Sequence, residues 1–286
     1  MKNLKYMAVA ALLACGALNA SAKDNVEYVD PFIGTTNFSI CNPGAIRPHG
    51  LMSVVPFNVM GSDLNVQDKD KRWWSACYEY NNKYFTGFAH VTLSGVGCPE
   101  MGTLLTMPTS GELCVDYRSY GSEYKNETAR PGYYSTELTK YGIKCEVAST
   151  MRSSIERYTF PKGKGNLLFN LGNGLTNEVG ASLCRVSDTE FEGTRLLGTF
   201  CYNPQAVFPM YFVVRVNKKP AAYGMWKKQP AFGNAQAQWD SDQGKYKLYP
   251  GYGRDMAGND IGYYFTASRH QLRRTPRADC ISFLAG

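Results

Sequence analysis

The sequence is poor in histidine and has no closely paired cysteines. Its three histidines, His49, His90 and His270, show no H-x-x-x-H spacing, and its nine cysteines include no C-x-x-C pair. Zinc sites usually draw their ligands from such short spacings, so a site of this kind is not expected. The cysteines are also spread too evenly for a small disulfide scaffold, which indicates that most of them are buried as small apolar side chains.

The body of the chain, residues 23–266, also carries little net charge. The formal net charge is +7, but two of these charges lie in residues 1–22 and three in residues 267–286, which leaves two for residues 23–266. A body this close to neutral excludes recognition of nucleic acid through net charge. Beyond residue 22 no apolar run approaches 18 residues and no helical periodicity is sustained, so neither a membrane-spanning helix nor long helices are expected.

Residues 1–22 have the form of a secretory signal peptide. Two lysines, Lys2 and Lys5, precede an apolar stretch, and the small residues at 20–22 form a cleavage site that ends at Ala22. A second interpretation of the same segment is a bacterial lipobox at residues 12–16, which would make Cys15 a lipidated first residue. Both interpretations predict an exported protein, which contacts a membrane only if it is lipidated at Cys15.

Residues 23–266 contain frequent turn residues between short runs that favour strands. Hydrophobic residues make up 44% of the chain and aromatic residues 13%, while 28 glycines and 14 prolines supply frequent turns. Residues 155–160 (IERYTF) and 166–171 (NLLFNL) are two strand-like runs, and the Gly-rich residues 161–165 between them predict a hairpin. Further strand-like runs occupy residues 195–202, 207–216 and 262–266. We therefore expect an all-β fold of stacked antiparallel sheets, in a single domain over residues 23–266.

Unusual motifs are concentrated near the start of this body. They read VDPFIGT at 29–35, NPGA at 42–45, PHGLM at 48–52, WWSACYEY at 73–80 and GFAHVTLSGVGCPEMG at 87–102. Aromatic rings stack on the C–H faces of a sugar, polar side chains bind its hydroxyl groups, and glycines let the backbone approach it. The motifs are therefore compatible with a carbohydrate site, although tyrosine and tryptophan are also common in sandwich cores.

These segments, in this order, resemble the N-terminal domain of glycoside hydrolase family 92, from about Val29 to Thr266. The resemblance implies an antiparallel β-supersandwich that packs on a C-terminal (α/α)6 barrel, with the active site between the two. It also implies an exported exo-acting α-mannosidase of Gram-negative bacteria, located in the periplasm or on the outer membrane as a lipoprotein, and active on mannose-containing glycans such as N-glycans. The family is calcium-dependent and inverting, with one carboxylic acid protonating the leaving oxygen and one carboxylate activating water.

The resemblance also suggests roles for individual residues. Trp74 matches a family tryptophan that borders the mannose pocket, and His90 matches the first histidine of a family G-F-S-H-T-H-L-S-G pattern. Together with Gly95 and Gly97 they are the expected substrate-binding residues. Because Thr92 stands where that pattern has its second histidine, the linkage preference stays open. Two alternatives also stay open, namely Trp74 as a core side chain and His90 as a hydrogen-bonded structural histidine.

A turn signal at residues 81–83 lies between Trp74 and His90. A hairpin there is expected to bring both side chains to one rim of the sandwich, beside the turn at residues 95–97, where they would form half of a sugar site.

The resemblance places both catalytic carboxylates and much of the calcium shell in the helical domain, so no catalytic or metal-binding residue is expected in this chain. Residues 267–286 depart from the family pattern, and their Arg-rich, structureless character indicates a frameshifted or truncated gene product, or else a natural tail. We expect a chain that is inactive alone and completes the pocket of a helical partner domain. Two other functions stay open, a stand-alone carbohydrate-binding module and an inert scaffold whose aromatics all lie in the core.

Overall fold

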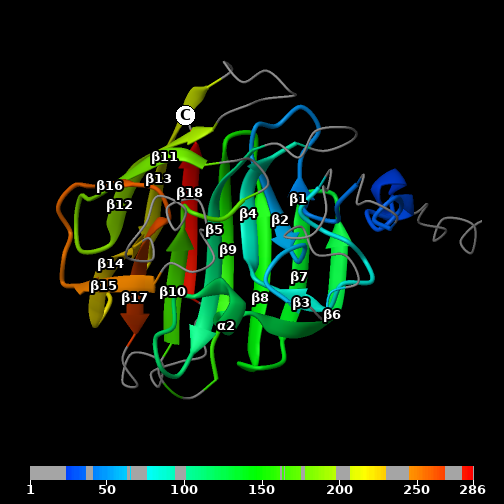
Figure 1. Ribbon diagram of the computed structural model, residues 1–286. Helices are drawn as coiled ribbons and strands as arrows, with labels where there is room; N and C mark the ends of the chain where they lie inside the picture. The colour runs from blue at the N-terminus through cyan, green and yellow to red at the C-terminus, as the bar shows by residue number, and fades with distance from the viewer. Residues whose placement is uncertain are drawn as a thin grey trace, which may run out of the picture. The chain divides into compact units, whose positions relative to one another are not determined.

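The computed structural model describes residues 24–36, 41–62, 65, 76–93, 101–161, 163, 165–174, 178–197, 207–229, 245–267 and 279–285. The chain divides into two compact units, Met1–Asp30 and Pro31–Gly286. In the first unit the described part contains a short 3-10 helix, η1 (Asn25–Tyr28), whose N-cap Asp24 accepts a hydrogen bond from the backbone N–H of Val26. The second unit holds all of the described strands (Figure 1).

Two antiparallel sheets make up the second unit. The eight-stranded sheet contains, in order across it, β1 (Ala45–Ile46), β2 (Ser53–Phe57), β4 (Gly87–Thr92), β5 (Met101–Ser110), β10 (Gly165–Asn170), β17 (Ile261–Ala267), β14 (Ala222–Gln229) and β15 (Lys245–Pro250). The ten-stranded sheet contains β16 (Met256–Gly258), β11 (Glu178–Arg185), β12 (Glu190–Leu197), β13 (Phe208–Val216), β18 (Asp279–Ala285), β9 (Ser153–Thr159), β8 (Ile143–Ser149), β7 (Tyr133–Leu138), β6 (Ser122–Arg130) and β3 (Tyr84–Phe85). This architecture confirms the expected all-β fold of stacked antiparallel sheets.

The two sheets face each other across an aromatic core. Phe191 of β12 lies 4.8 Å from Phe169 of β10 and 4.6 Å from Tyr263 of β17, measured between ring centroids. Farther along the sandwich, Phe88 of β4 lies 6.0 Å from Tyr134 of β7. Each buried aromatic side chain removes about 150–250 Å² from water, so these rings supply a large share of the hydrophobic stabilisation.

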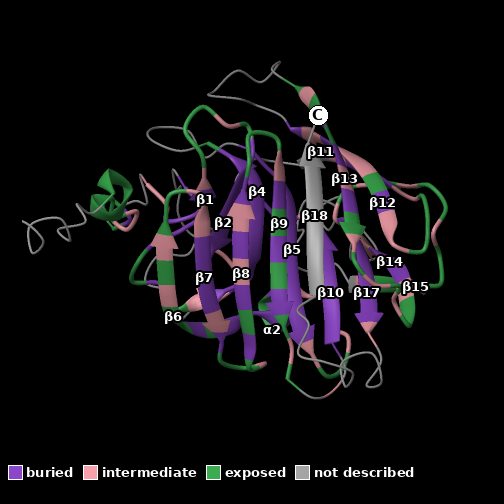
Figure 2. Ribbon diagram, turned by 180° about the vertical axis from the view of Figure 1, so that it is seen from behind, coloured by how far each residue is buried: buried purple, intermediate pink, exposed green. Residues whose placement is uncertain are grey.

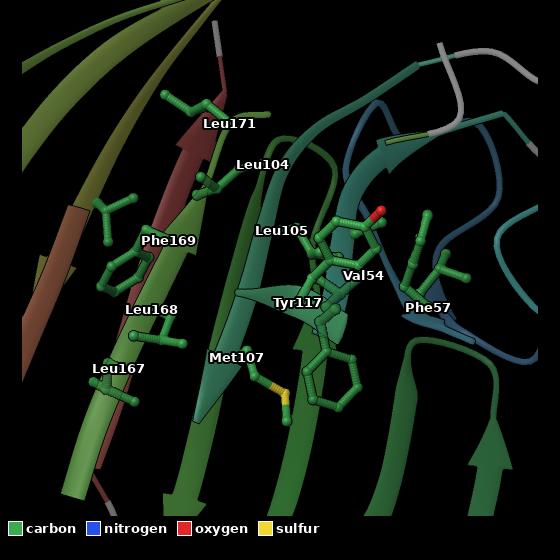
Figure 3. Close-up of a cluster of buried hydrophobic side chains, with 14 of the residues drawn as sticks. Val54, Phe57, Leu104, Leu105, Met107, Tyr117, Leu167, Leu168, Phe169 and Leu171 are labelled. Atoms are coloured by element: carbon green, nitrogen blue, oxygen red, sulfur yellow. The ribbon is translucent and has the colours of Figure 1, made fainter. Parts of the chain in front are cut away.

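The two sheets differ in how they are covered. All residues of β4 and β10 are buried, whereas buried and exposed residues alternate along β9 (Figure 2). Part of the cover over the outer face of the eight-stranded sheet is α2 (Tyr117–Tyr120), and Figure 3 draws Tyr117 in one cluster with Leu105 and Met107 of β5. A strand buried on both faces is expected to contain an apolar run, and β10 has one at residues 167–169.

The predicted hairpin over residues 155–171 is wrong. Its two strands exist as β9 and β10, but β9 pairs with β8 and β18 while β10 pairs with β5 and β17 in the other sheet. The segment between them therefore crosses from one sheet to the other. The physical reason is that Leu167, Leu168 and Phe169 are all buried, so β10 needs neighbours on both sides and cover on both faces.

The structureless character expected of residues 267–286 is wrong for Asp279–Ala285. These residues form β18, which pairs with β13 on one side and with β9 on the other. The segment contains a run of apolar residues, Ile281-Ser282-Phe283-Leu284, of the kind that favours a strand. The other expected strands are found as β12, β13 and β17, with residues 198–202 outside the described part of the chain. Among the described helices, none has the length and apolarity needed to cross a bilayer.

Candidate functional site

Of the four expected substrate-binding residues, the structure describes one. Trp74, Gly95 and Gly97 lie outside the described residues, in the segments 66–75 and 94–100. His90 is described and lies in the middle of β4. The candidate site can therefore be described in two places. These are the residues that flank the two segments and the surroundings of His90.

Both ends of segment 66–75 are held by one buried asparagine at the end of β2. The side-chain amide of Asn65 donates to the backbone oxygen of Asn58 at 3.0 Å, and the backbone N–H of Asn58 donates to the oxygen of Cys77 at 3.0 Å. The side chain of Asn58 also bonds to Glu79 in both directions, because its amide donates to Glu79 O and its oxygen accepts from Glu79 N, each at 2.8 Å. Asn58 thus holds the described residues on both sides of the tryptophan segment.

A turn over residues 79–82 overlaps the one expected at residues 81–83 and is built on the carboxylate of Glu79. The hairpin expected there is wrong for the described residues, because β4 pairs with β2 and β5 while β3 pairs with β6. The Glu79 carboxylate is fully buried and accepts from the backbone N–H groups of Asn81 and Asn82, at 2.8 and 3.1 Å. The side-chain amide of Asn81 donates to its second oxygen at 3.0 Å. Hydrogen bonds from three amide donors stabilise the buried charge and explain why a glutamate is found there.

A second carboxylate, Glu127 of β6, contacts Tyr78, which follows the tryptophan segment in the chain. It accepts hydrogen bonds from the hydroxyls of Tyr78 and Tyr134, at 3.0 and 2.7 Å. It follows Asn126, which has φ 56° and lies at a bulge in the pairing of β6 with β7. Burial raises the pKa of Glu127 above its ordinary value, and the two hydroxyl donors oppose that shift. Because a bulge re-aims the side chains around it, the inward direction of Glu127 had no signal in the sequence.

The flanks of segment 94–100 carry backbone strain. Thr92 and Met101 are paired between β4 and β5, and the backbone N–H of Thr92 donates to the hydroxyl of Ser53 at 2.7 Å. Val91 has φ 56° and Met101 has φ 71°, values that are unusual for any residue other than glycine and most unusual for a β-branched one. Strain of this kind costs about 1–3 kcal/mol per residue and is concentrated at functional sites.

The two segments start from opposite ends of β4. Segment 66–75 is anchored near Asn58, which follows the residue that pairs with Gly87, whereas segment 94–100 begins beyond Thr92. Five residues of strand separate these ends, a distance of about 16 Å. The ten residues of segment 66–75 can cover that distance, because an extended chain spans about 3.3 Å per residue. The common rim for Trp74, Gly95 and Gly97 therefore stays a prediction.

His90 lies between the two sheets and is fully buried. Its Nδ1 lies 3.0 Å from the backbone oxygen of Leu104, and its Nε2 contacts Oε1 of Glu156 on β9 of the ten-stranded sheet. The other oxygen of Glu156 accepts from the hydroxyl of Thr106 at 2.7 Å and from the hydroxyl of Tyr158. Because the oxygen of Leu104 can only accept, Nδ1 carries a proton, and a further proton is held between Nε2 and the carboxyl group.

This arrangement is that of a structural histidine that links the two sheets. A role for His90 in contacting sugar stays a prediction. Sequence reasoning missed Glu156, because its partner is 66 residues away and residues 155–160 carry no local sign of a buried charge. On β9 it is Ser154, Glu156 and Tyr158 that face inward, while Ile155 remains 48% exposed.

The profile of the Glycosyl hydrolase family 92 N-terminal domain matches residues 28–270. The chain belongs to this family. The match covers the second unit from its start through β17 and includes His90 and the segments 66–75 and 94–100.

Solved structures of family 92 enzymes share the fold. The family GH92 α-mannosidase BT3965 from Bacteroides thetaiotaomicron is 23% identical with a TM-score of 0.72, over 91% of this chain and 33% of that chain. The family 92 glycosyl hydrolase ccman5 is 23% identical with a TM-score of 0.70, over 92% of this chain and 32% of that one. The inverting mannosidase BT2199 from Bacteroides thetaiotaomicron is 18% identical with a TM-score of 0.64, over 93% and 32%. This chain therefore spans about a third of the length of these enzymes, and a comparison with curated proteins found no match.

Proposed function

We propose that this chain is the N-terminal β-sandwich part of an exported, calcium-dependent, inverting α-mannosidase. In this role it contributes part of a mannose pocket and packs on a helical catalytic domain. The observation that carries the proposal is the family 92 match over residues 28–270, together with a fold shared with enzymes described as an α-mannosidase and as an inverting mannosidase. Because the chain spans about a third of those enzymes, the remaining parts of the activity are assigned to a partner domain.

Trp74, Gly95 and Gly97 are the proposed sugar contacts. Two observations support a functional role for their segments. Asn58 holds both ends of the tryptophan segment through buried hydrogen bonds, and residues of unfavourable φ flank the glycine-rich segment on both sides. His90 lies on β4, the strand that precedes the glycine-rich segment, and its buried contacts with Leu104 and Glu156 support a role in fixing the position of β4 beside the pocket.

The catalytic carboxylates and most calcium ligands are assigned to the partner domain. Inverting hydrolysis requires an acid and a base on opposite sides of the scissile bond, each contributing about 10²–10⁴ in rate. Among the described residues, no three His, Cys, Asp or Glu side chains come together as a possible ligand set.

Export rests on residues 1–22. Removal of the signal segment predicts a mature N-terminus at Lys23, or a lipidated Cys15 if the lipobox is used. The protein would then reside in the periplasm or on the outer membrane. N-terminal sequencing of the protein recovered from the cell envelope tests this, and a mature chain that still begins at Met1 would contradict export.

The pocket is tested by titrating the chain with mannose while tryptophan fluorescence is recorded. Half a site should bind with a dissociation constant on the order of millimolar. Trp74→Ala should abolish the response, whereas Trp73→Ala, with circular dichroism to confirm folding, should retain it. An unchanged response in Trp74→Ala would remove this residue from the site. Release of mannose from an α-mannoside by the purified chain, dependent on calcium, would contradict the assignment of catalysis to a partner domain.

A further inference from the structure

A hollow of about 720 Å³ lies over β16, β11, β12 and β13, at one edge of the ten-stranded sheet. Its volume falls in the range of small-molecule sites. The side chains that give it its chemistry are Ser182, Cys184, Glu192, Thr194, Tyr211 and Asp255. Figure 1 shows these strands side by side, on the far side of β18 from β9 and Glu156.

The hollow is on the outward face of this sheet. Phe212 is buried and packs against Phe191 in the aromatic core, so its neighbour Tyr211 points the other way and is 57% exposed. Tyr211 pairs across β12 with Thr194, which in turn pairs with Ser182 on β11. Residues directly opposite one another in antiparallel strands share a face, so a ring and two hydroxyls form one row across three strands.

A second row beside the first carries the negative charge. Cys184 pairs with Glu192, two residues along the strands from Ser182 and Thr194. Asp255 precedes β16 next to Cys184, and its hydrogen bond raises the pKa of the Cys184 thiol, which therefore stays protonated at neutral pH. Neither Glu192 nor Asp255 has an ion pair with a residue that the structure describes, whereas Glu190 and Asp188 nearby are paired with arginines.

The residues that line the hollow indicate which class of ligand it can bind. In the described lining there is no lysine, arginine or histidine, so a phosphate or another anion would be repelled. An apolar ligand would desolvate two carboxylates without replacing their hydrogen bonds. A hexose satisfies both rows, because its C–H face packs on the tyrosine ring while its hydroxyls donate to the carboxylates. Neighbouring strands are about 4.8 Å apart, which puts both rows within reach of one sugar ring.

We propose that this hollow binds a neutral hexose unit of a glycan, with Tyr211 as the stacking platform and Glu192 and Asp255 as hydrogen-bond acceptors. The site goes beyond the mannose pocket proposed above. It lies on the outer face of the ten-stranded sheet, at the opposite edge from β3, and shares no residue with segments 66–75 or 94–100. It would hold a glycan on the surface of the sandwich rather than at the reacting bond.

The test is saturation-transfer difference NMR of the full chain with methyl α-mannopyranoside and, separately, methyl β-glucopyranoside. At least one should bind with a dissociation constant on the order of millimolar. Tyr211→Ala should weaken binding about tenfold or more, Tyr211→Phe should retain it, and Glu192→Gln should weaken it several-fold. The matched control is Tyr133→Ala, which removes an outward-facing tyrosine of the same sheet on β7, several strands away.

Each other outcome overturns the site. Binding by Tyr211→Ala as tight as that of the wild type, or no binding of either sugar by the wild type, would show that the hollow takes no hexose. Binding that disappears in Trp74→Ala and survives in Tyr211→Ala would assign the sugar to the mannose pocket and leave the proposed function intact. Tyr211-dependent dimerisation in sedimentation experiments would make the hollow an interface between two copies of the chain.

Discussion

Replacing Glu156 with glutamine is expected to weaken the link between the two sheets. In the wild type the carboxyl group contacts His90 of the eight-stranded sheet and accepts hydrogen bonds from the hydroxyls of Thr106 and Tyr158. All four residues are 0–1% exposed, so water cannot replace a lost partner. Glutamine can place its oxygen toward the two hydroxyls and donate from its amide group to an unprotonated Nε2, so the hydrogen bonds become neutral ones and the charge-assisted part of the His90 contact is lost.

The magnitude follows from this burial. Removing one partner of a buried charged pair costs about 3–5 kcal/mol. Because glutamine keeps neutral hydrogen bonds to these partners, the loss should be at the lower end of this range, about 3 kcal/mol. In a domain of this size 1 kcal/mol corresponds to about 2–4 °C in Tm, so the variant should melt about 6–12 °C below the wild type.

Urea unfolding gives the same quantity at constant temperature. Trp226 is fully buried and reports the transition by fluorescence. The matched control is Glu146→Gln on the neighbouring strand β8, where Glu146 accepts two hydrogen bonds from Arg157, at 2.8 and 2.9 Å, on the outward face. Such surface pairs contribute less than about 1 kcal/mol. A Glu156→Gln variant no less stable than Glu146→Gln would refute the idea that the inter-sheet contact contributes to stability.

Three further variants test other parts of the structure. Burial raises the pKa of Glu127 above 4.5, so its ionisation destabilises the folded state as the pH rises through the raised value. Glu127→Gln should therefore be more stable than the wild type at neutral pH, and the difference in urea midpoint should vanish near pH 4. Asn58→Ala keeps the backbone contacts to Asn65 and Cys77 but leaves the backbone oxygen and N–H of Glu79 without their buried partners. It should therefore lose about 2–4 kcal/mol and make segment 66–75 cleave faster in limited proteolysis. A Cβ at Gly262 would overlap the indole ring of Trp226, so Gly262→Ala should cost at least about 1–3 kcal/mol in thermal unfolding, and an unchanged Tm would show that the ring can move aside.

The positions of strands could be predicted from the sequence, but the strands with which they pair could not. Residues 207–216 read as a strand because apolar and β-branched residues fill them, and β13 occupies almost the same range. Nothing local specifies which sheet a strand joins. Sheets stack about 10 Å apart, and a link of five residues reaches farther than that, so residues 161–165 can close a hairpin or cross between sheets equally well.

In the candidate site, too, local features could be predicted from the sequence and contacts between distant strands could not. The turn after Glu79 was visible as an asparagine pair, because turn chemistry is local. Glu156 and Glu127 were not visible, since each depends on side chains from strands distant in the sequence, and at Glu127 on a bulge as well. A glutamate in a strand looks like a solvent-facing residue until its partners are known.

The position of β18 has a consequence for how the protein is made. Ile281 pairs with Glu156 on one side and with Val216 on the other, so β18 fills the gap between two groups of strands that are synthesised long before it. Until then β9 and β13 each present an unpaired edge, which invites association with other chains. Pairing over such sequence distances is slow. If the chain is exported as proposed, its larger sheet would still be open between β9 and β13 when all but residues 279–286 have been synthesised.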